Sequence, residues 1–264
     1  MTDPKSLALL TIETLQSMPK LLEQIYGDLA KPGVTQVGKA LETILGLGNT
    51  ALIPLRLLNE KFKLIEGRNL DNYRKKLIEI EAEKIIPVIP EIGIPIMDKL
   101  SYVQNETLAE LYINLLAKAS SKEFCSLAHP AFVKIIDLFS PDEALLIQAL
   151  KQANAFPTLQ IEAQLVSGGD ARIGQFYTPL EKIVSLIYPQ NIQVYLTNLD
   201  RSGIIEIVDN TWLSNEKFYD DLKSQHALQE SPPFDPKTIK AIRWKKGHID
   251  VTPFGKLFID ACAK

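Results

Sequence analysis

The amino-acid sequence predicts an α+β protein, mostly α, in which a helical N-terminal half is followed by a winged-helix-like C-terminal domain. Apolar residues recur at helical spacing in the first half, whereas residues 158–166 (TLQIEAQLV) alternate between apolar and polar like a half-buried strand. The expected order in the second half is helix, strand, helix, helix, strand, hairpin and helix, which is typical of a winged helix-turn-helix. We therefore expect a helical domain at residues 1–125 and a winged-helix-like domain at 126–264, with an insertion at 209–237.

The first part of the helical domain contains an uncharged run at residues 43–55. An amphipathic stretch at 7–30 ends before it, at Lys31-Pro32-Gly33. The uncharged run is shorter than the roughly 20 residues that cross a bilayer. It predicts either two buried helices hinged at residues 46–49 or a hairpin that inserts into a membrane or a partner. The candidate residues of this segment are Ile44, Leu45, Leu47, Leu52, Ile53 and Leu55.

The centre of the chain carries the clearest helical patterns. Residues 68–84 mix both charge signs and predict a solvated helix, whereas the prolines of residues 85–95 predict an extended connector. One amphipathic stripe consists of Leu108, Leu111, Tyr112, Leu115, Leu116 and Ala119, and a second covers residues 132–139. Ser140, Pro141 and Glu143 then form the signature of a capping box, which predicts a helix from Pro141 onwards.

The remaining elements of the winged-helix prediction come from short local patterns. Residues 167–170 (SGGD) predict a turn, and helices are expected at 179–188 and 191–201, before a strand at 204–208. Lys246-Gly247 is a two-residue loop suited to a tight hairpin between strands 238–245 and 248–252. Thr252-Pro253 begins the closing helix, and the insertion holds a helix of its own (SNEKFYDDLKSQHALQ).

Charge makes DNA the less favoured partner. The whole chain has a formal net charge of −3, and the two helices that would read DNA, at residues 171–203, have a net charge of only +1. The basic residues around Trp244 still offer a candidate nucleic-acid contact. Alternatively, they lie at the edge of a hairpin, where lysines prevent pairing with the strand of another molecule. The candidate contacts are Lys240, Arg243, Lys245, Lys246 and Arg201.

The sequence lacks a residue grouping typical of an enzyme. Cys125 and His129 share a helical spacing but are too few for a metal site, and the SGGD turn lacks the lysine of a phosphate loop. We therefore expect no catalytic, cofactor-binding or metal-binding residues. Two distant cysteines and the absence of a secretory signal predict reduced thiols and a cytoplasmic protein.

Four long phrases of the sequence read LETILGLGNTALIPLRLLNEKFKL, IPVIPEIGIPIMDKLSYVQNETLAELYINLLAKAS, LAHPAFVKIIDLFSPDEALLIQAL and TPFGKLFIDAC. They resemble the bacterial Abi-alpha family, whose members are associated with abortive infection. The resemblance implies an anti-phage role without defined catalytic residues. We therefore expect a non-enzymatic defence protein that acts through a host or phage protein, a second copy of itself, or a membrane with which it associates on activation. The alternative is a winged-helix DNA-binding transcriptional regulator.

Overall fold

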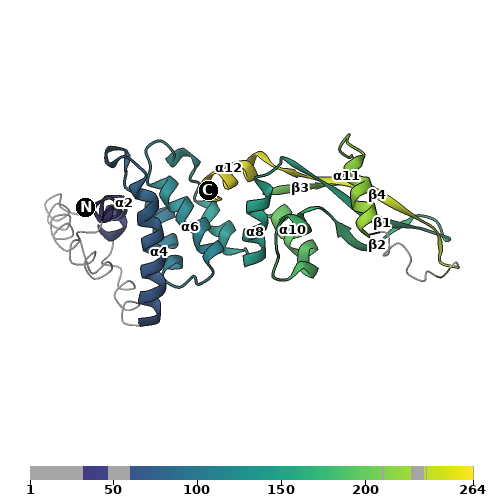
Figure 1. Cartoon of the computed structure of the whole chain (residues 1–264), viewed down its shortest axis with the longest axis horizontal. Coiled ribbons are helices and arrows are strands. Elements are labelled where there is room, and N and C mark those ends of the chain that lie inside the picture. Colours follow the sequence, from purple (N-terminus) through teal and green to yellow (C-terminus); the bar gives the residue numbers. More distant parts are fainter. Residues whose placement is uncertain (1–31, 47–59, 210, 227–234, 236, 264) are drawn as a thin grey trace, which may run out of the picture. The chain divides into compact units, whose positions relative to one another are not determined.

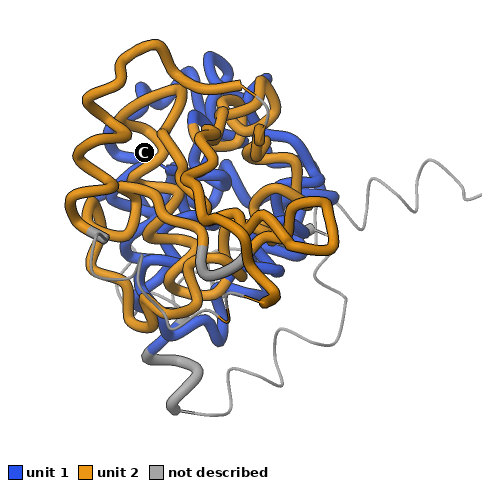
Figure 2. The backbone as a smooth tube through the Cα atoms, turned by 90° about the vertical axis from the view of Figure 1, so that its right-hand side faces the viewer, with its two compact units in different colours: residues 1–139, 260–264 blue, residues 140–259 orange. Residues whose placement is uncertain are grey.

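The computed structural model describes residues 32–46, 60–209, 211–226, 235 and 237–263 as an α+β protein (Figure 1). The chain divides into two compact units, coloured separately in Figure 2. Unit 1 comprises residues 1–139 and 260–264, and unit 2 comprises residues 140–259. The boundary that the sequence suggests after residue 125 falls inside unit 1, at the 3-10 turn η2 (Cys125–Leu127).

Unit 1 is helical in the part that the structure describes. Its helices are α2 (Val34–Gly46), α4 (Glu60–Ile78), α5 (Pro90–Leu100), α6 (Glu106–Ala119) and α7 (Ala131–Asp137), with a 3-10 turn η1 (Ala82–Lys84). Helix α6 contacts α4, α5 and α7. Every residue from 111 to 117 is buried, so this helix forms the centre of the unit. The predicted helices at 108–119 and 132–139 are therefore confirmed.

Two predicted elements of unit 1 end at other residues than the sequence suggested. The charged helix ends at Ile78 and not at residue 84. The proline-rich connector is extended only up to Ile89, because Pro90 occupies the first helical position of α5, where a missing N–H costs no hydrogen bond. Pro95 lies inside this helix. Ile92, Ile96 and Leu100 form a buried stripe along it, and their burial outweighs the hydrogen bond that Pro95 cannot donate.

Unit 2 is built around an antiparallel sheet in the order β2-β1-β4-β3. Its strands are β1 (Ala155–Leu165), β2 (Asp170–Tyr177), β3 (Ile205–Val208) and β4 (Ile239–Val251). Its helices are α8 (Pro141–Leu150), α9 (Leu180–Ile183), α10 (Ile192–Arg201) and α11 (Lys217–His226), with a 3-10 turn η3 (Pro189–Asn191). The last helix, α12 (Pro253–Cys262), begins in unit 2, and its residues from 260 onwards belong to unit 1. The capping box is present at the start of α8, where the Ser140 side chain accepts from the Glu143 N–H and the Glu143 carboxylate accepts from the Ser140 N–H.

The predicted hairpin at Lys246-Gly247 is wrong, because β4 runs through these residues without a turn. Lys246 pairs with Leu159 of β1, and Gly247 pairs with Thr158. Glycine is required here by close packing, since a Cβ atom at residue 247 would lie 2.6 Å from the carbonyl oxygen of Val208. The end of β4 pairs instead with β3. The winged-helix arrangement is therefore not confirmed.

The turn at residues 167–170 is confirmed, and it joins two strands of which the sequence indicated only the first. The Leu165 N–H donates to the Gly169 carbonyl, while Gly168 and Gly169 have φ angles of +93° and +85°. The second strand is β2. The helix predicted at 179–188 contracts to the short α9 at Leu180–Ile183.

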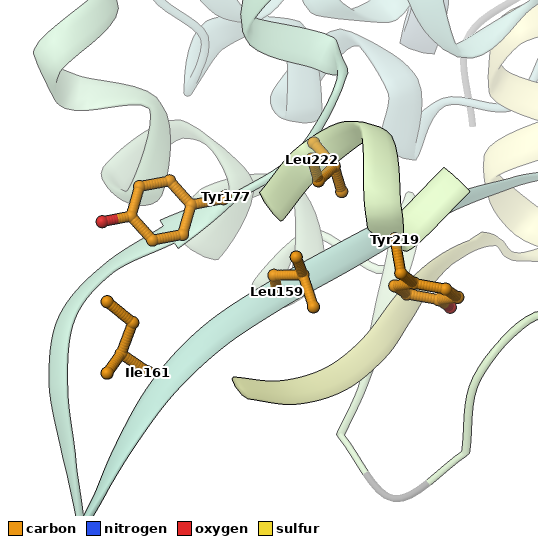
Figure 3. Close-up of a cluster of buried hydrophobic side chains, with 5 residues drawn as sticks. All are labelled: Leu159, Ile161, Tyr177, Tyr219 and Leu222. Atoms are coloured by element: carbon orange, nitrogen blue, oxygen red, sulfur yellow. The ribbon is translucent and has the colours of Figure 1, made fainter. Parts of the chain in front are cut away.

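The predicted insertion contributes to the core of unit 2. Figure 3 shows the cluster formed by Leu159 and Ile161 of β1, Tyr177 of β2, and Tyr219 and Leu222 of α11. The fully buried Tyr219 hydroxyl donates to the Gly247 carbonyl at 2.9 Å and accepts from the Leu213 N–H at 2.8 Å. The helix predicted in the insertion is confirmed, and it covers one face of the sheet.

Candidate interaction surfaces

The basic residues of β4 are arranged around acidic partners. Arg243 contacts Glu162 at 3.1 Å and Asp170 at 2.6 Å, and Lys245 contacts the second oxygen of Glu162 at 3.3 Å. Lys246 forms an ion pair with Glu216. Because successive side chains of a strand point to opposite faces, Lys246 lies on the face opposite to Arg243 and Lys245. The five candidate residues therefore do not form one cationic surface; Lys240 and Arg201 are exposed on different elements.

Glu162 is the centre of this charge cluster. Only 9% of the residue is exposed. Burial by itself would raise the pKa of its carboxyl, but hydrogen bonds from Arg243 and Lys245 hold the pKa below its ordinary value. The carboxylate is thus ionised at neutral pH and holds β1 and β4 together. Arg243 and Lys245 neutralise an internal charge, which reduces what they can offer to a phosphate.

The apolar run at residues 43–55 is only partly described. Ile44 lies in α2 with 3% of its surface exposed, and a Cβ atom at Gly93 of α5 would lie 1.9 Å from its Cδ1 atom. Ile44 is therefore a core residue packed on α5. Leu45 lies in the last turn of α2, but its side chain is outside what the structure describes, and Leu47, Leu52, Ile53 and Leu55 lie outside the described residues. In the described ranges, no helix combines the length and the apolarity that crossing a bilayer requires.

The residues considered for metal binding have other contacts. The Nδ1 atom of His129 accepts a hydrogen bond from the Ala131 N–H at 3.1 Å, beside the start of α7. Cys125 is exposed and outside any disulfide. Among the described residues, His, Cys, Asp and Glu side chains do not come together in groups of three or more that could hold a metal ion.

A polar groove of about 340 Å³ lies between α4 and α6 in unit 1. Its cationic wall is formed by α4 and includes Arg68, Lys75 and Lys76, and α6 contributes Glu106 and Glu110. Two ion pairs cross the groove, Arg68–Glu106 at 3.3 Å and Lys76–Glu110 at 3.7 Å. The cationic side chains of α4 and the carboxylates of α6 partly neutralise one another. The groove therefore favours neither an anionic nor a cationic ligand.

A buried carboxylate in α8 organises the polypeptide before α10. Asp142 is 1% exposed, and its Oδ1 accepts from the Ile187 N–H at 2.6 Å. Its Oδ2 accepts from the Tyr188 N–H at 2.9 Å and the Tyr195 hydroxyl at 2.8 Å. Burial alone would raise the pKa of Asp142, but these three donors together hold the pKa below its ordinary value. From the sequence, Asp142 belongs to the first turn of a predicted helix, where a carboxylate is usually solvated. Its burial was not predicted.

The family comparison identifies the chain more decisively than any of these sites. The family model described as "Abortive infection alpha" matches residues 66–262, which is about three quarters of the sequence. The chain belongs to the abortive infection alpha (Abi-alpha) family. The match begins within α4 and ends with α12, so it includes described residues of both units, and the resemblance found in the sequence is confirmed.

No curated protein matches the sequence. A solved structure of an uncharacterized protein from the hydrocarbon-degrading marine bacterium Alcanivorax borkumensis SK2 is similar at 20% identity, over 54% of this chain and 96% of the other chain. Its TM-score is 0.32.

Proposed function

We propose that this Abi-alpha protein defends a bacterial host against phage by abortive infection, and that it acts by binding a protein partner and not by catalysis. The match to the abortive infection alpha family over residues 66–262 carries the proposal. The buried carboxylates support the non-catalytic part. Asp142 and Glu162, which are the candidates for acid-base chemistry by burial, accept hydrogen bonds from within the fold.

The DNA-binding alternative receives no support from the basic residues. A DNA-binding surface neutralises phosphates with lysine and arginine side chains that are free to do so. Arg243, Lys245 and Lys246 each contact a carboxylate of the chain. We therefore expect weak retention on double-stranded DNA, with no preference for sequence.

The proposed site of action is the cytoplasm, and membrane entry by the run at 43–55 stays a prediction. It is tested by comparing Leu52→Asp with Leu52→Met in cells, after both variants are shown to unfold at the temperature of the wild type. Membrane entry requires that Leu52→Asp abolish protection while Leu52→Met retains it. Protection by a stably folded Leu52→Asp protein, or wild-type protein that stays in the cytosol throughout infection, would exclude it.

Phage plating tests the defence function directly. The gene is expressed with its native neighbours in a bacterium that is challenged with a broad panel of phages, and a version with an early stop codon serves as the control. We expect the efficiency of plating to fall for some phages and infected cells to die before releasing progeny. Equal plating on both strains across the whole panel would refute the proposed function.

A further inference from the structure

The polar groove between α4 and α6 is held in shape at one end. The two helices lie side by side (Figure 1). Arg68 donates to the Glu106 carboxylate and to the carbonyl oxygens of residues 103 and 104. The same guanidinium donates to the side-chain oxygen of Asn69, which is fully buried. These bonds fasten the start of the groove, and they occupy the donors of Arg68, so a ligand must be held at the other end.

The other end of the groove carries two opposite charges that are not paired with each other. Lys75 and Glu79 are exposed, and both line the groove. The Lys75 ammonium donates to Oδ1 of Asn72 at 3.2 Å, about one turn back along α4. Within the part of the chain that the structure describes, neither Lys75 nor Glu79 forms an ion pair. A cation and an anion therefore stand apart along one wall of the groove.

Their separation sets the length of a ligand that contacts both. Asn72, which holds the Lys75 ammonium, and Glu79 are seven residues apart, which corresponds to about 10 Å along a helix. An extended polypeptide advances about 3.3 Å per residue, so the two terminal charges of a free dipeptide or tripeptide lie about 7–10 Å apart. In a free α-amino acid both charges are attached to the same carbon, so it is too short to reach both residues.

The ion pair across this end of the groove also favours a ligand of both signs. Lys76 and Glu110 lie 3.7 Å apart, and their side chains are 29% and 56% exposed. An exposed ion pair contributes little to stability, so a ligand can separate it. A ligand with one charge would replace one partner and leave the other without a counter-ion. A ligand with both charges replaces both partners.

The size and the floor of the groove suit a small molecule. Its volume of about 340 Å³ is near the lower end of the range for small-ligand sites, which begins at about 300 Å³. Ala109 and Ile113 of α6 are buried and line it, and they offer apolar contact between the charged positions. The groove therefore fits the backbone and small side chains of a short peptide.

We propose that the groove between α4 and α6 binds a free peptide of two or three residues, with its terminal carboxylate on Lys75 and its terminal ammonium on Glu79. Asn72 positions the Lys75 ammonium for this contact. Lys76 and Glu110 lie beside the bound peptide and interact with its polar groups. This site goes beyond the proposed defence function and does not depend on it.

A set of alanine peptides tests the site on the purified full-length chain. Trialanine is titrated by calorimetry, beside trialanine acetylated at its amino end, trialanine amidated at its carboxyl end, the doubly blocked peptide, and free alanine. We expect trialanine to bind with a dissociation constant of about 1 mM or lower. Blocking either end, or shortening the ligand to alanine, should weaken binding at least about fivefold, because one charge loses its partner.

Charge-removing variants assign each end of the peptide. With Lys75→Gln, trialanine and its amidated form should bind equally, because the carboxylate has lost its partner. With Glu79→Gln, trialanine and its acetylated form should bind equally. Lys134→Gln in α7 and Glu91→Gln in α5 are the matched controls, since both side chains are exposed and lie outside the groove. All four variants should unfold at the wild-type temperature, and the controls should bind trialanine like the wild type.

Several results would overturn the site. They are the absence of trialanine binding up to about 10 mM, and equal affinity for trialanine and the doubly blocked peptide. Alanine that binds as tightly as trialanine would show that the length is wrong. Wild-type affinity in both groove variants would place the peptide elsewhere. The titrations involve no phage, so a chain that binds trialanine but protects no cell would disprove the defence function alone, and a protecting chain that binds no peptide would disprove the site alone.

Discussion

Asp142→Asn is the change that most directly tests how unit 2 holds the segment before α10. The carboxylate accepts from the N–H groups of Ile187 and Tyr188 and from the hydroxyl of Tyr195. Asparagine keeps the shape of the side chain but has one acceptor oxygen, and its NH₂ group must face at least one of these donors. The substitution therefore leaves a donor unpaired without creating a cavity.

The magnitude follows from the three hydrogen bonds. An unpaired buried donor costs about 1–3 kcal/mol, and replacing a charged acceptor by a neutral one weakens each remaining bond by about 1 kcal/mol. One unpaired donor and two weakened bonds together amount to about 3–5 kcal/mol, and local relaxation of the exposed segment that contains Ile187 and Tyr188 lowers this figure. We expect Asp142→Asn to lower the free energy of unfolding by about 2–4 kcal/mol.

The pH dependence supplies an independent check on the cause. The pKa of Asp142 is lowered in the folded protein, so its carboxylate stabilises the fold above the unfolded-state pKa of about 3.9. This stabilisation is lost as the pH falls from there through the lower folded-state pKa. The difference in unfolding free energy between wild type and Asp142→Asn should therefore be constant from about pH 5 to 8 and shrink below about pH 4.

Urea unfolding measures the global loss, and amide hydrogen exchange at Ile187 and Tyr188 measures the local one. Asp221→Asn is the control, because Asp221 is exposed on α11 and its substitution should change stability by less than about 0.5 kcal/mol. A loss for Asp142→Asn no larger than the control, or unchanged exchange at both amides, would show that the carboxylate does not anchor this segment. A difference that does not shrink at low pH would show that its charge is not the cause.

The remaining predictions also concern stability and are checked by urea unfolding. Gly255→Ala should lower the free energy of unfolding by more than about 2 kcal/mol, because the alanine Cβ would lie 1.9 Å from the carbonyl oxygen of Ile204. This loss exceeds the gain that alanine brings to a helix, and an unchanged stability would contradict the packing. Gly67→Ala in α4 is its counterpart and should stabilise by about 1 kcal/mol, because a Cβ there has no atom within 4 Å. Tyr219→Phe should lower the free energy of unfolding by about 1–3 kcal/mol, since the Gly247 carbonyl and the Leu213 N–H both lose their partner. Wild-type stability in this variant would show that the hydroxyl does not hold α11 on the sheet.

Local sequence signals were sufficient for the elements whose cause is local. The capping box at Ser140, the apolar stripe of α6 and the Thr252-Pro253 start of α12 each depend on residues within a few positions of one another. The family phrases were equally readable, because they are a property of the sequence alone. For these reasons the α+β class and the abortive infection family were predictable before the structure.

The candidate sites were less predictable, because their chemistry depends on partners distant in sequence. Arg243 lies 73 residues from Asp170 and 81 from Glu162, so a run that looked cationic is neutralised by acids that the sequence does not place beside it. A helix predicted over 179–188 gave no reason to expect that Ile187 and Tyr188 would face solvent.

The sequence by itself determined where helices begin, which strand alternates and which family the chain belongs to, because these depend on spacing along the polypeptide. Only the tertiary structure decided the roles of Gly247 in strand packing and of Asp142 in hydrogen bonding. Lys246-Gly247 fits a hairpin locally, yet β1 offers pairing partners along the whole of β4, and the glycine instead admits the Val208 carbonyl. Asp142 reads as a solvated helix start, yet donors 45 to 53 residues away converge on it and bury its charge. Pairing and burial between distant segments are set by the packed fold, and no local pattern encodes them.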